Sequence, residues 1–338
     1  MLDKDHLSEP IISAMQKADV PGLAISIIEN NKIVYDQVFG VKNTKNRLPL
    51  QKNTLFQAAS LSKPVFAYLV LKLCERGEID LDAPLSRYWS ASYSPDRRSL
   101  AITTRQVLAH STGFPNWRSD TKLELETVPG GRFGYSGEGY EYLQKVVEHL
   151  TGQALHDYAQ VNLFEPLEMK DTTFIWGLDE VGEFLLDDEN NVLPPRDAIF
   201  SSAAFSLLTV SSDYARFLMA MLNPEENHPF KLNQASANAM LTPQIPVGRH
   251  RLLSWGLGWG IQHTEIGDGF WHWGGVQNNY FSYCFALKQE RSGVVILTND
   301  ESGLDICEVV AQVALSNSLV HPAFEWIRPI DAWNPRGS

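Results

Sequence analysis

Apolar positions follow strand-like patterns near both ends of the chain and helical spacing between them. Residues 22–28 and 32–39 are typical of two strands. A tight turn at Asn30 and Asn31 would join them, because asparagine tolerates the positive φ of hairpin turns. Three later segments also have strand character, at 255–261, 280–287 and 294–298. These segments predict an antiparallel sheet built from both chain termini.

The sequence between these strands is predicted to be mainly helical, with a solvated acidic loop at residues 179–191. Helices are expected at 10–18, from Ser60 to a C-terminal glycine at 77, from Thr103 or Thr104 to 108, and at 139–150, 154–163, 214–222 and 304–315. Residues 211–213 would cap the 214–222 helix. The pattern therefore predicts an α+β fold. Residues 1–80 and 245–330 would form a discontinuous sheet lobe flanked by helices, and residues 81–244 an inserted, mainly helical lobe.

Charge and composition narrow the expected partners and compartment. A net charge of −12 and an isoelectric point near 5.2 argue against binding to nucleic acid or to anionic membranes. The chain opens with polar and acidic residues, unlike a signal peptide, and its three cysteines lack metal-ligand spacing. We expect a cytoplasmic protein, or a periplasmic one if a leader has been removed. No cofactor or metal is expected, and the oligomeric state is left open.

The segment Ser60-Leu61-Ser62-Lys63 places a hydroxyl and an amine three residues apart at the start of an apolar helix. Residues at i and i+3 share a helix face, so both groups should point into one space. Pro64 suits the first turn of a helix, because backbone N–H groups in that turn have no intrahelical acceptor and proline lacks only this group. Burial would lower the pKa of Lys63 and make it a base for Ser60. The pattern predicts acyl transfer through a serine ester.

The same spacing recurs at Ser119-Asp120-Thr121-Lys122, so the bare pattern is a weak motif. This second copy lies in a polar stretch with no long apolar run behind it. We interpret it as a surface loop and place the nucleophile at Ser60.

Further motifs surround the Ser60 segment in a fixed order. They are Val20-Pro21-Gly22-Leu23-Ala24, Val107-Leu108-Ala109-His110-Ser111-Thr112-Gly113, Tyr135-Ser136-Gly137, Tyr214-Ala215-Arg216-Phe217, Gly256-Leu257-Gly258-Trp259-Gly260 and His272-Trp273-Gly274-Gly275. Across residues 20–315 the chain resembles the serine β-lactamase and penicillin-binding-protein superfamily. The class C β-lactamase-like branch, with its family VIII carboxylesterases and D-amino-acid peptidases, is the most similar. The resemblance implies a β-lactamase/transpeptidase-like fold with the active site at the interface of the two lobes.

The second motif of this superfamily implies that Tyr135 is catalytic beside Ser60 and Lys63. A phenol near a cation has its anion stabilised, so Tyr135 and Lys63 could share the proton taken from Ser60. The sequence leaves open which of the two is the base, because coupled groups share their titration.

The third motif, most familiar as Lys-Thr-Gly, matches His272-Trp273-Gly274, and the resemblance implies that these residues bind substrate. It also implies an oxyanion hole formed by the backbone N–H groups of Ser60 and Gly275. Sliding the alignment by one residue would replace Gly275 by Val276.

Two departures from the superfamily pattern bear on the substrate. Gly137 stands where an asparagine usually holds the substrate's amide, and His272 stands where a lysine supplies a fixed positive charge. Both favour small carboxylic esters with an apolar acyl group, for which tryptophans and phenylalanines could form walls. We expect an esterase with at most weak β-lactamase activity. A β-lactamase or D-amino-acid peptidase is the near alternative, and a non-catalytic binding protein the distant one.

Three other readings are weaker. The run from Gly134 to Gly139 fails as a Gly-x-Ser-x-Gly nucleophile elbow because Glu138 stands at the second glycine position. His110 is interpreted as structural, locking its loop by hydrogen bonds. His149 and His156 lack an acidic partner at ligand spacing, which argues against zinc.

Overall fold

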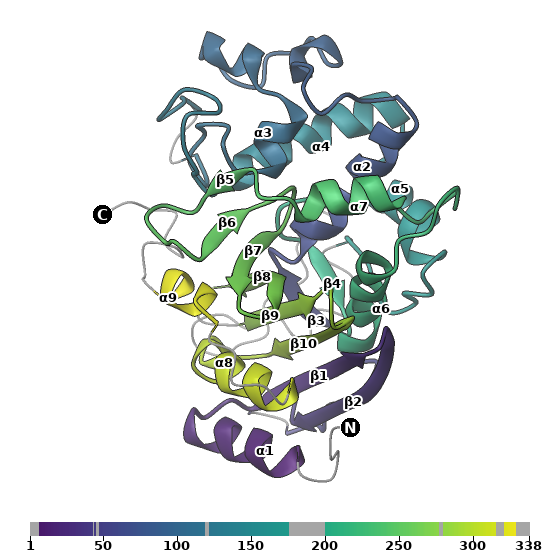
Figure 1. Cartoon of the computed structure of the whole chain (residues 1–338), viewed down its shortest axis with the longest axis vertical. Helices are drawn as coiled ribbons and strands as arrows, with labels where there is room; N and C mark the ends of the chain where they lie inside the picture. Colours follow the sequence, from purple (N-terminus) through teal and green to yellow (C-terminus); the bar gives the residue numbers. More distant parts are fainter. Residues whose placement is uncertain are drawn as a thin grey trace.

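The computed structural model describes residues 7–42, 44, 47–118, 122–175, 200–276, 280–315 and 321–328. Its main feature is an eight-stranded antiparallel sheet with the order β2-β1-β10-β9-β8-β7-β6-β5 (Figure 1). The strands are β1 (Gly22–Glu29), β2 (Lys32–Gly40), β5 (Ile245–Pro246), β6 (Leu253–Trp255), β7 (Gly260–Thr264), β8 (Gly267–Val276), β9 (Tyr280–Leu287) and β10 (Ser292–Thr298).

Strands from the N-terminal and C-terminal parts of the chain lie next to each other in this sheet. Strand β1 pairs with β10, with Leu23 opposite Thr298, and also with β2. The turn between β1 and β2 contains Asn30 and Asn31 at φ values of 49° and 59°. The predicted hairpin and the predicted α+β sheet from both termini are confirmed.

Alternating residues of the central strands bury both faces of the sheet. Leu23 and Ile25 face one hydrophobic cluster, whereas Ala24 faces the other. The first face is covered by α1 (Ser8–Lys17), α8 (Gly303–Ala314) and α9 (Ala323–Ile327), and Figure 1 shows α1 and α8 lying together there. The second face is covered by α2 (Ser62–Glu75) and α6 (Ser211–Leu222).

The remaining helices lie in the central part of the sequence. They are α3 (Thr104–Leu108), α4 (Gly137–Thr151), α5 (Leu155–Ala159) and α7 (Gln234–Leu241), with 3₁₀ turns at Leu85–Arg87 and Arg97–Ala101. A two-stranded sheet, β3 (Phe56–Ala59) with β4 (Leu207–Thr209), joins this region to the Ser60 segment. Thr103 caps α3 with a reciprocal capping box, and Gly77 after α2 has φ 72°, as expected.

Some predicted elements are wrong in detail. Residues 256–259 are not a strand, because Gly258 has φ 86° and packs closely against Ala67 in α2. Helix α6 already begins at Ser211, with no side-chain cap. Asp213 instead accepts hydrogen bonds from the Asp171 backbone and the Thr172 hydroxyl. The segment 154–163 is α-helical only to Ala159 and continues as a π-helix to Phe164.

Other predictions remain untested. The loop at 179–191 and the Ser119 segment lie outside the described residues. The division into two lobes at residues 80 and 245 stays a prediction. In the part of the chain that the structure describes, no helix has the length and apolar character needed to span a membrane.

Candidate active site

Ser60 lies in a tight turn between β3 and α2. The preceding Ala59 has φ 45°, a left-handed conformation that is rare for residues other than glycine and carries strain. The Ser62 hydroxyl holds this turn, because it donates to the Ala59 carbonyl at 2.6 Å and accepts from the Leu207 backbone N–H at 2.9 Å. The turn ends at the first residues of α2, so Ser60 is presented at the helix N-terminus as predicted.

Lys63 is the buried cation of the site. Its Nζ lies 3.0 Å from Ser60 Oγ and donates to the Ala204 carbonyl at 2.8 Å. Burial lowers the pKa of Lys63 to about 7, and the carboxylate of Glu141 partly opposes this shift. A large fraction of Lys63 is therefore an uncharged amine at neutral pH, within reach of the Ser60 proton.

Tyr135 completes the predicted trio. The Lys63 ammonium lies 4.8 Å from the centre of the Tyr135 ring. The Tyr135 hydroxyl is buried and lies near the Ser60 hydroxyl, without a contact among the described residues that meets full hydrogen-bond geometry. Burial raises the pKa of Tyr135 well above its ordinary value, while the Ser60 hydroxyl acts in the opposite direction. The expected stabilisation of its anion is outweighed by desolvation, so Tyr135 is a neutral phenol.

Two buried histidines flank Tyr135 in opposite hydrogen-bonding states. The Ser136 N–H donates to His110 Nδ1 at 3.0 Å, so the His110 proton is on Nε2. His272 Nδ1 lies 2.7 Å from the Trp273 carbonyl and must donate, which leaves His272 Nε2 as an acceptor. Both Nε2 atoms lack a partner among the described residues. Burial lowers the pKa of each imidazole well below its usual value, so both are neutral.

Strand β8 brings the third motif against the Ser60 turn. A Cβ on Gly274 would lie 2.1 Å from the Ala58 carbonyl oxygen, so only glycine allows β8 to approach β3 this closely. The Ser282 hydroxyl on β9 donates to the same Ala58 carbonyl at 3.0 Å. Strand β7 pairs with β8 only as far as Trp271. Among the described residues, His272 to Gly275 therefore have no paired strand on the β7 side of β8.

Trp273 of the third motif is a buried residue. Its ring centroid is 4.9 Å from that of Tyr135. Its indole packs with those of Trp255, Trp271 and Trp326. The indole therefore packs against Tyr135, and the substrate-binding role of Trp273 stays a prediction.

Two contributors to the site, the Ala204 carbonyl and Glu141, are not among the residues predicted from the sequence. The Ala204 carbonyl is a backbone group, which no residue pattern reveals. Its segment is held by α4, where Glu141 accepts from the Ser202 hydroxyl and Gln144 accepts from the Ala203 N–H at 2.7 Å. The one available signal was an acidic residue on the inner side of an amphipathic helix, three positions before Gln144.

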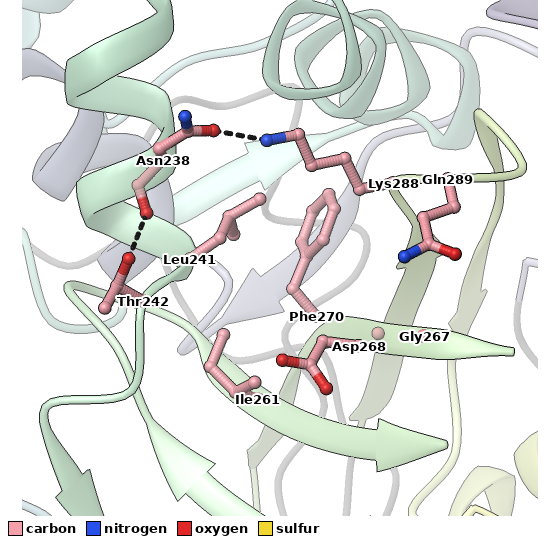
Figure 2. A pocket seen from close by; sticks show the side chains of 10 residues that line it. Asn238, Leu241, Thr242, Ile261, Gly267, Asp268, Phe270, Lys288 and Gln289 are labelled. Atoms are coloured by element: carbon pink, nitrogen blue, oxygen red, sulfur yellow. Dashed lines mark hydrogen bonds between the residues drawn. The ribbon is translucent and has the colours of Figure 1, made fainter. Parts of the chain in front are cut away.

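A hollow of about 580 Å³ lies at the Gly267 end of β8, beside the β7–β8 turn (Figure 2). Its charged groups are already engaged: Lys288 donates to Asn238, and Asp268 pairs with His263 at 2.8 Å. This hollow is remote from the third motif, because β8 advances about 16 Å from Gly267 to His272 at 3.3 Å per residue. Within the described residues no cluster of His, Cys, Asp or Glu could hold a metal ion. The candidate active site is therefore at Ser60.

Residues 9–314 match the family model described as Beta-lactamase, which is most of the chain. The chain belongs to the β-lactamase family. This match confirms the superfamily resemblance that the sequence motifs predicted.

Relatives in this family carry different names. Protein Flp of Staphylococcus aureus (strain MW2) is 23% identical over 311 residues, covering 84% of this chain and 61% of Flp. The chain thus spans about three-fifths of the length of that relative. Esterase EstB of Burkholderia gladioli is 27% identical over 194 residues, covering 48% of this chain and 49% of EstB. A solved class C β-lactamase shares the fold with a TM-score of 0.79 and 19% identity, covering 94% of this chain and 97% of that one.

Proposed function

We propose that this protein hydrolyses small carboxylic esters through an acyl-enzyme formed on Ser60. The observation that carries the proposal is the 3.0 Å contact between Ser60 Oγ and a buried Lys63 amine with a pKa of about 7. A general base works best when its pKa is near the operating pH. No other described serine has a buried amine of this kind within hydrogen-bonding distance.

The roles of the three residues follow from their protonation states. Ser60 Oγ attacks the ester carbonyl carbon while its proton passes to the neutral amine of Lys63. The backbone N–H groups of Ser60 and Gly275 hold the oxyanion. When the C–O bond to the alcohol breaks, the leaving alkoxide takes a proton from the neutral Tyr135 phenol, which Lys63 reprotonates. Water then attacks the acyl-enzyme by the reverse order of proton transfers, releasing the acid and Ser60.

The surroundings of this trio favour an ester over an anionic amide. His272 occupies the place of the superfamily's lysine, and burial keeps it neutral, so it offers no fixed charge to a substrate carboxylate. Gly137 offers no side-chain amide to hold a peptide group. The similarity to a relative named an esterase also supports this ranking. The class C β-lactamase fold supports the alternative, β-lactam or D-amino-acid amide hydrolysis.

The test compares p-nitrophenyl butyrate with a chromogenic cephalosporin. We expect kcat/KM for the ester to exceed that for the cephalosporin, and Ser60→Ala to reduce ester turnover by roughly 10⁴-fold or more. Ser119→Ala is the matched control, because it removes the serine of the other Ser-x-x-Lys sequence, and it should leave turnover unchanged. Ester turnover that survives Ser60→Ala would exclude Ser60 as the nucleophile. Faster cephalosporin turnover would reverse the ranking of substrates.

A fluorophosphonate probe distinguishes the enzyme from a non-catalytic binding protein. Intact-mass analysis should find one adduct per chain, located on Ser60 and absent in Ser60→Ala. A wild-type protein that gains no adduct would favour the binding-protein interpretation.

A further inference from the structure

The position where the superfamily carries an asparagine is covered by an indole ring. A Cβ on Gly137 would lie 2.4 Å from Trp117 Cη2 and 2.6 Å from Cζ2. Real Cβ atoms do not approach aromatic carbons so closely, so any side chain at position 137 would have to displace Trp117. The absence of the asparagine and the placement of Trp117 are therefore one structural feature.

Hydrogen bonds on both sides hold Trp117 in place. Asn116 accepts from the Gly137 N–H through its side-chain oxygen at 2.9 Å and through its carbonyl at 3.0 Å. Arg118 forms a bidentate pair with Glu138, from Nε at 2.8 Å and Nη2 at 2.5 Å. The 116–118 segment is thus hydrogen-bonded to the start of α4, with Asn116 bound to Gly137 and Arg118 bound to Glu138. The indole is pre-organised over Gly137 and needs no rearrangement to meet a ligand.

Trp117 also reaches the segment that binds Lys63. Its ring meets Phe205 edge-on, with 5.6 Å between centroids, and Phe205 in turn lies 5.9 Å from Phe200. Phe205 directly follows Ala204, whose carbonyl accepts from the Lys63 ammonium. The three aromatic side chains are each only partly buried. Together they form a continuous row of apolar rings. The row runs from Gly137, two residues after Tyr135, to the segment whose Ala204 carbonyl binds Lys63.

We propose that Trp117 is the specificity-determining residue for the acyl group, and that it selects flat or branched apolar acyl chains over amide-bearing ones. The inference rests on the proposed ester hydrolysis and adds the acyl preference. In the superfamily this position addresses the acyl part of the substrate through an asparagine amide. In this protein the carbons of the Trp117 ring occupy that position, and burying an apolar acyl chain against them is favourable. An amide placed there would lose its hydrogen bonds to water without replacement.

The test varies the acyl group at a constant p-nitrophenyl leaving group. In the wild type, kcat/KM should be higher for the phenylacetyl ester than for the acetyl ester. Trp117→Ala should lower kcat/KM for the phenylacetyl ester roughly tenfold and for the acetyl ester less than about threefold. Trp117→Phe should restore most of the preference. Trp89→Ala is the matched control, because Trp89 is another half-buried tryptophan of the same hydrophobic cluster that packs on Tyr142. It should leave the ratio of the two esters unchanged.

A double-mutant cycle tests the link between the two positions. Gly137→Asn alone should displace the indole and reduce turnover of both esters. Adding Trp117→Ala should relieve the collision, so that the double variant is more active than the product of the two single effects predicts. The variants' thermal unfolding midpoints show which of them remain folded.

Several outcomes would overturn the proposal. One is an equal loss on both esters in Trp117→Ala, and another is independent effects in the cycle. A third is a change of preference that appears only when the alcohol, rather than the acyl group, is varied. Failure of the proposed function looks different: wild type would then turn over neither ester while still folding normally.

Discussion

Lys63 sets the pH range in which the site can work. Its pKa is lowered to about 7 by burial, and the amine must be uncharged to accept the Ser60 proton. We expect kcat/KM for an ester to rise with pH through an apparent pKa near 7 and to fall at acid pH as Lys63 becomes protonated. Neutral His110 and His272 should not add a second limb, because burial holds their pKa values well below 6.5. A flat pH profile between 5.5 and 8.5 would contradict Lys63 as the base.

Glu141 is expected to modulate that limb. Its carboxylate raises the pKa of Lys63, and it accepts from the Ser202 hydroxyl, which in turn accepts from the Ala204 N–H at 3.1 Å. Replacing the charge in Glu141→Gln should therefore move the acid limb of kcat/KM to lower pH, by roughly 0.5 pH unit. Glu148→Gln, two turns further along α4, should leave the limb in place. Loss of activity at every pH with an unmoved limb would make Glu141 a purely structural residue.

The same burial makes Lys63 costly for the fold. Its pKa is about 7 in the folded chain and near 10.5 when unfolded, so the unfolded state binds more protons between these values. The contribution of Lys63 to the free energy of unfolding should therefore be least favourable below pH 7 and should rise as the pH increases toward 10.5. We expect Lys63→Met to abolish turnover yet raise stability at pH 7. The net gain should be about 2 kcal/mol, after allowing for the Ala204 carbonyl left unpaired. Urea unfolding at pH 7 and pH 9.5 measures it, and the gain should be smaller at pH 9.5.

Elements with strong local patterns could be predicted from the sequence, and those fixed by distant contacts could not. The β1–β2 hairpin, α2 and α4 follow from asparagine turns, glycine stops and apolar spacing. Strands β3 and β4 were missed because each is short, and their pairing joins residues about 150 positions apart. The apolar side chains of residues 255–261 predict a strand, yet residues 256–259 are irregular because Gly258 packs against α2. The site follows the same division. Ser60 and Lys63 lie three residues apart in the sequence, so their proximity follows from local structure. The positions of the Ala204 carbonyl and of the indole over Gly137 depend on tertiary packing.

The close approach of β8 to β3 can be tested at a single glycine. Gly274→Ala would place a Cβ 2.1 Å from the Ala58 carbonyl oxygen, a backbone atom that cannot rotate away. We expect a loss of roughly 2 kcal/mol of stability and a fall in kcat of more than about tenfold, because the strand beside Ser60 must shift. Gly134→Ala is a stringent control: it adjoins Tyr135, but its Cβ would meet nothing within 4 Å. Near-normal turnover in Gly274→Ala would show that the site tolerates the shift.

At the scale of the molecule, the site depends on segments from the whole length of the chain. Ser60 and Lys63 come from the first third, Tyr135 from the loop just before α4, Glu141 from α4 itself, and the third motif from strand β8. Even α9, the last described helix, takes part. Its Trp326 lies 6.4 Å from the Tyr135 ring and 4.9 Å from Trp273, between centroids. Helix α9 therefore packs against Tyr135, the residue proposed to protonate the leaving group.

This connection predicts that a substitution in α9 changes activity. Trp326→Ala should open space in the cluster of Trp255, Trp271 and Trp273, costing about 2 kcal/mol because Trp326 is only partly buried. Tyr135 would lose one of its packing partners, so kcat for a p-nitrophenyl ester should fall several-fold at temperatures where the variant is fully folded. Arg328→Ala, two residues further along, removes a surface ion pair with Glu308 and a cation–π contact with Phe324, and should change stability by less than about 1 kcal/mol. Thermal unfolding and kcat measured on both variants separate the two effects. A Trp326→Ala protein that loses stability but keeps full kcat would show that α9 supports the sheet alone and leaves Tyr135 in place.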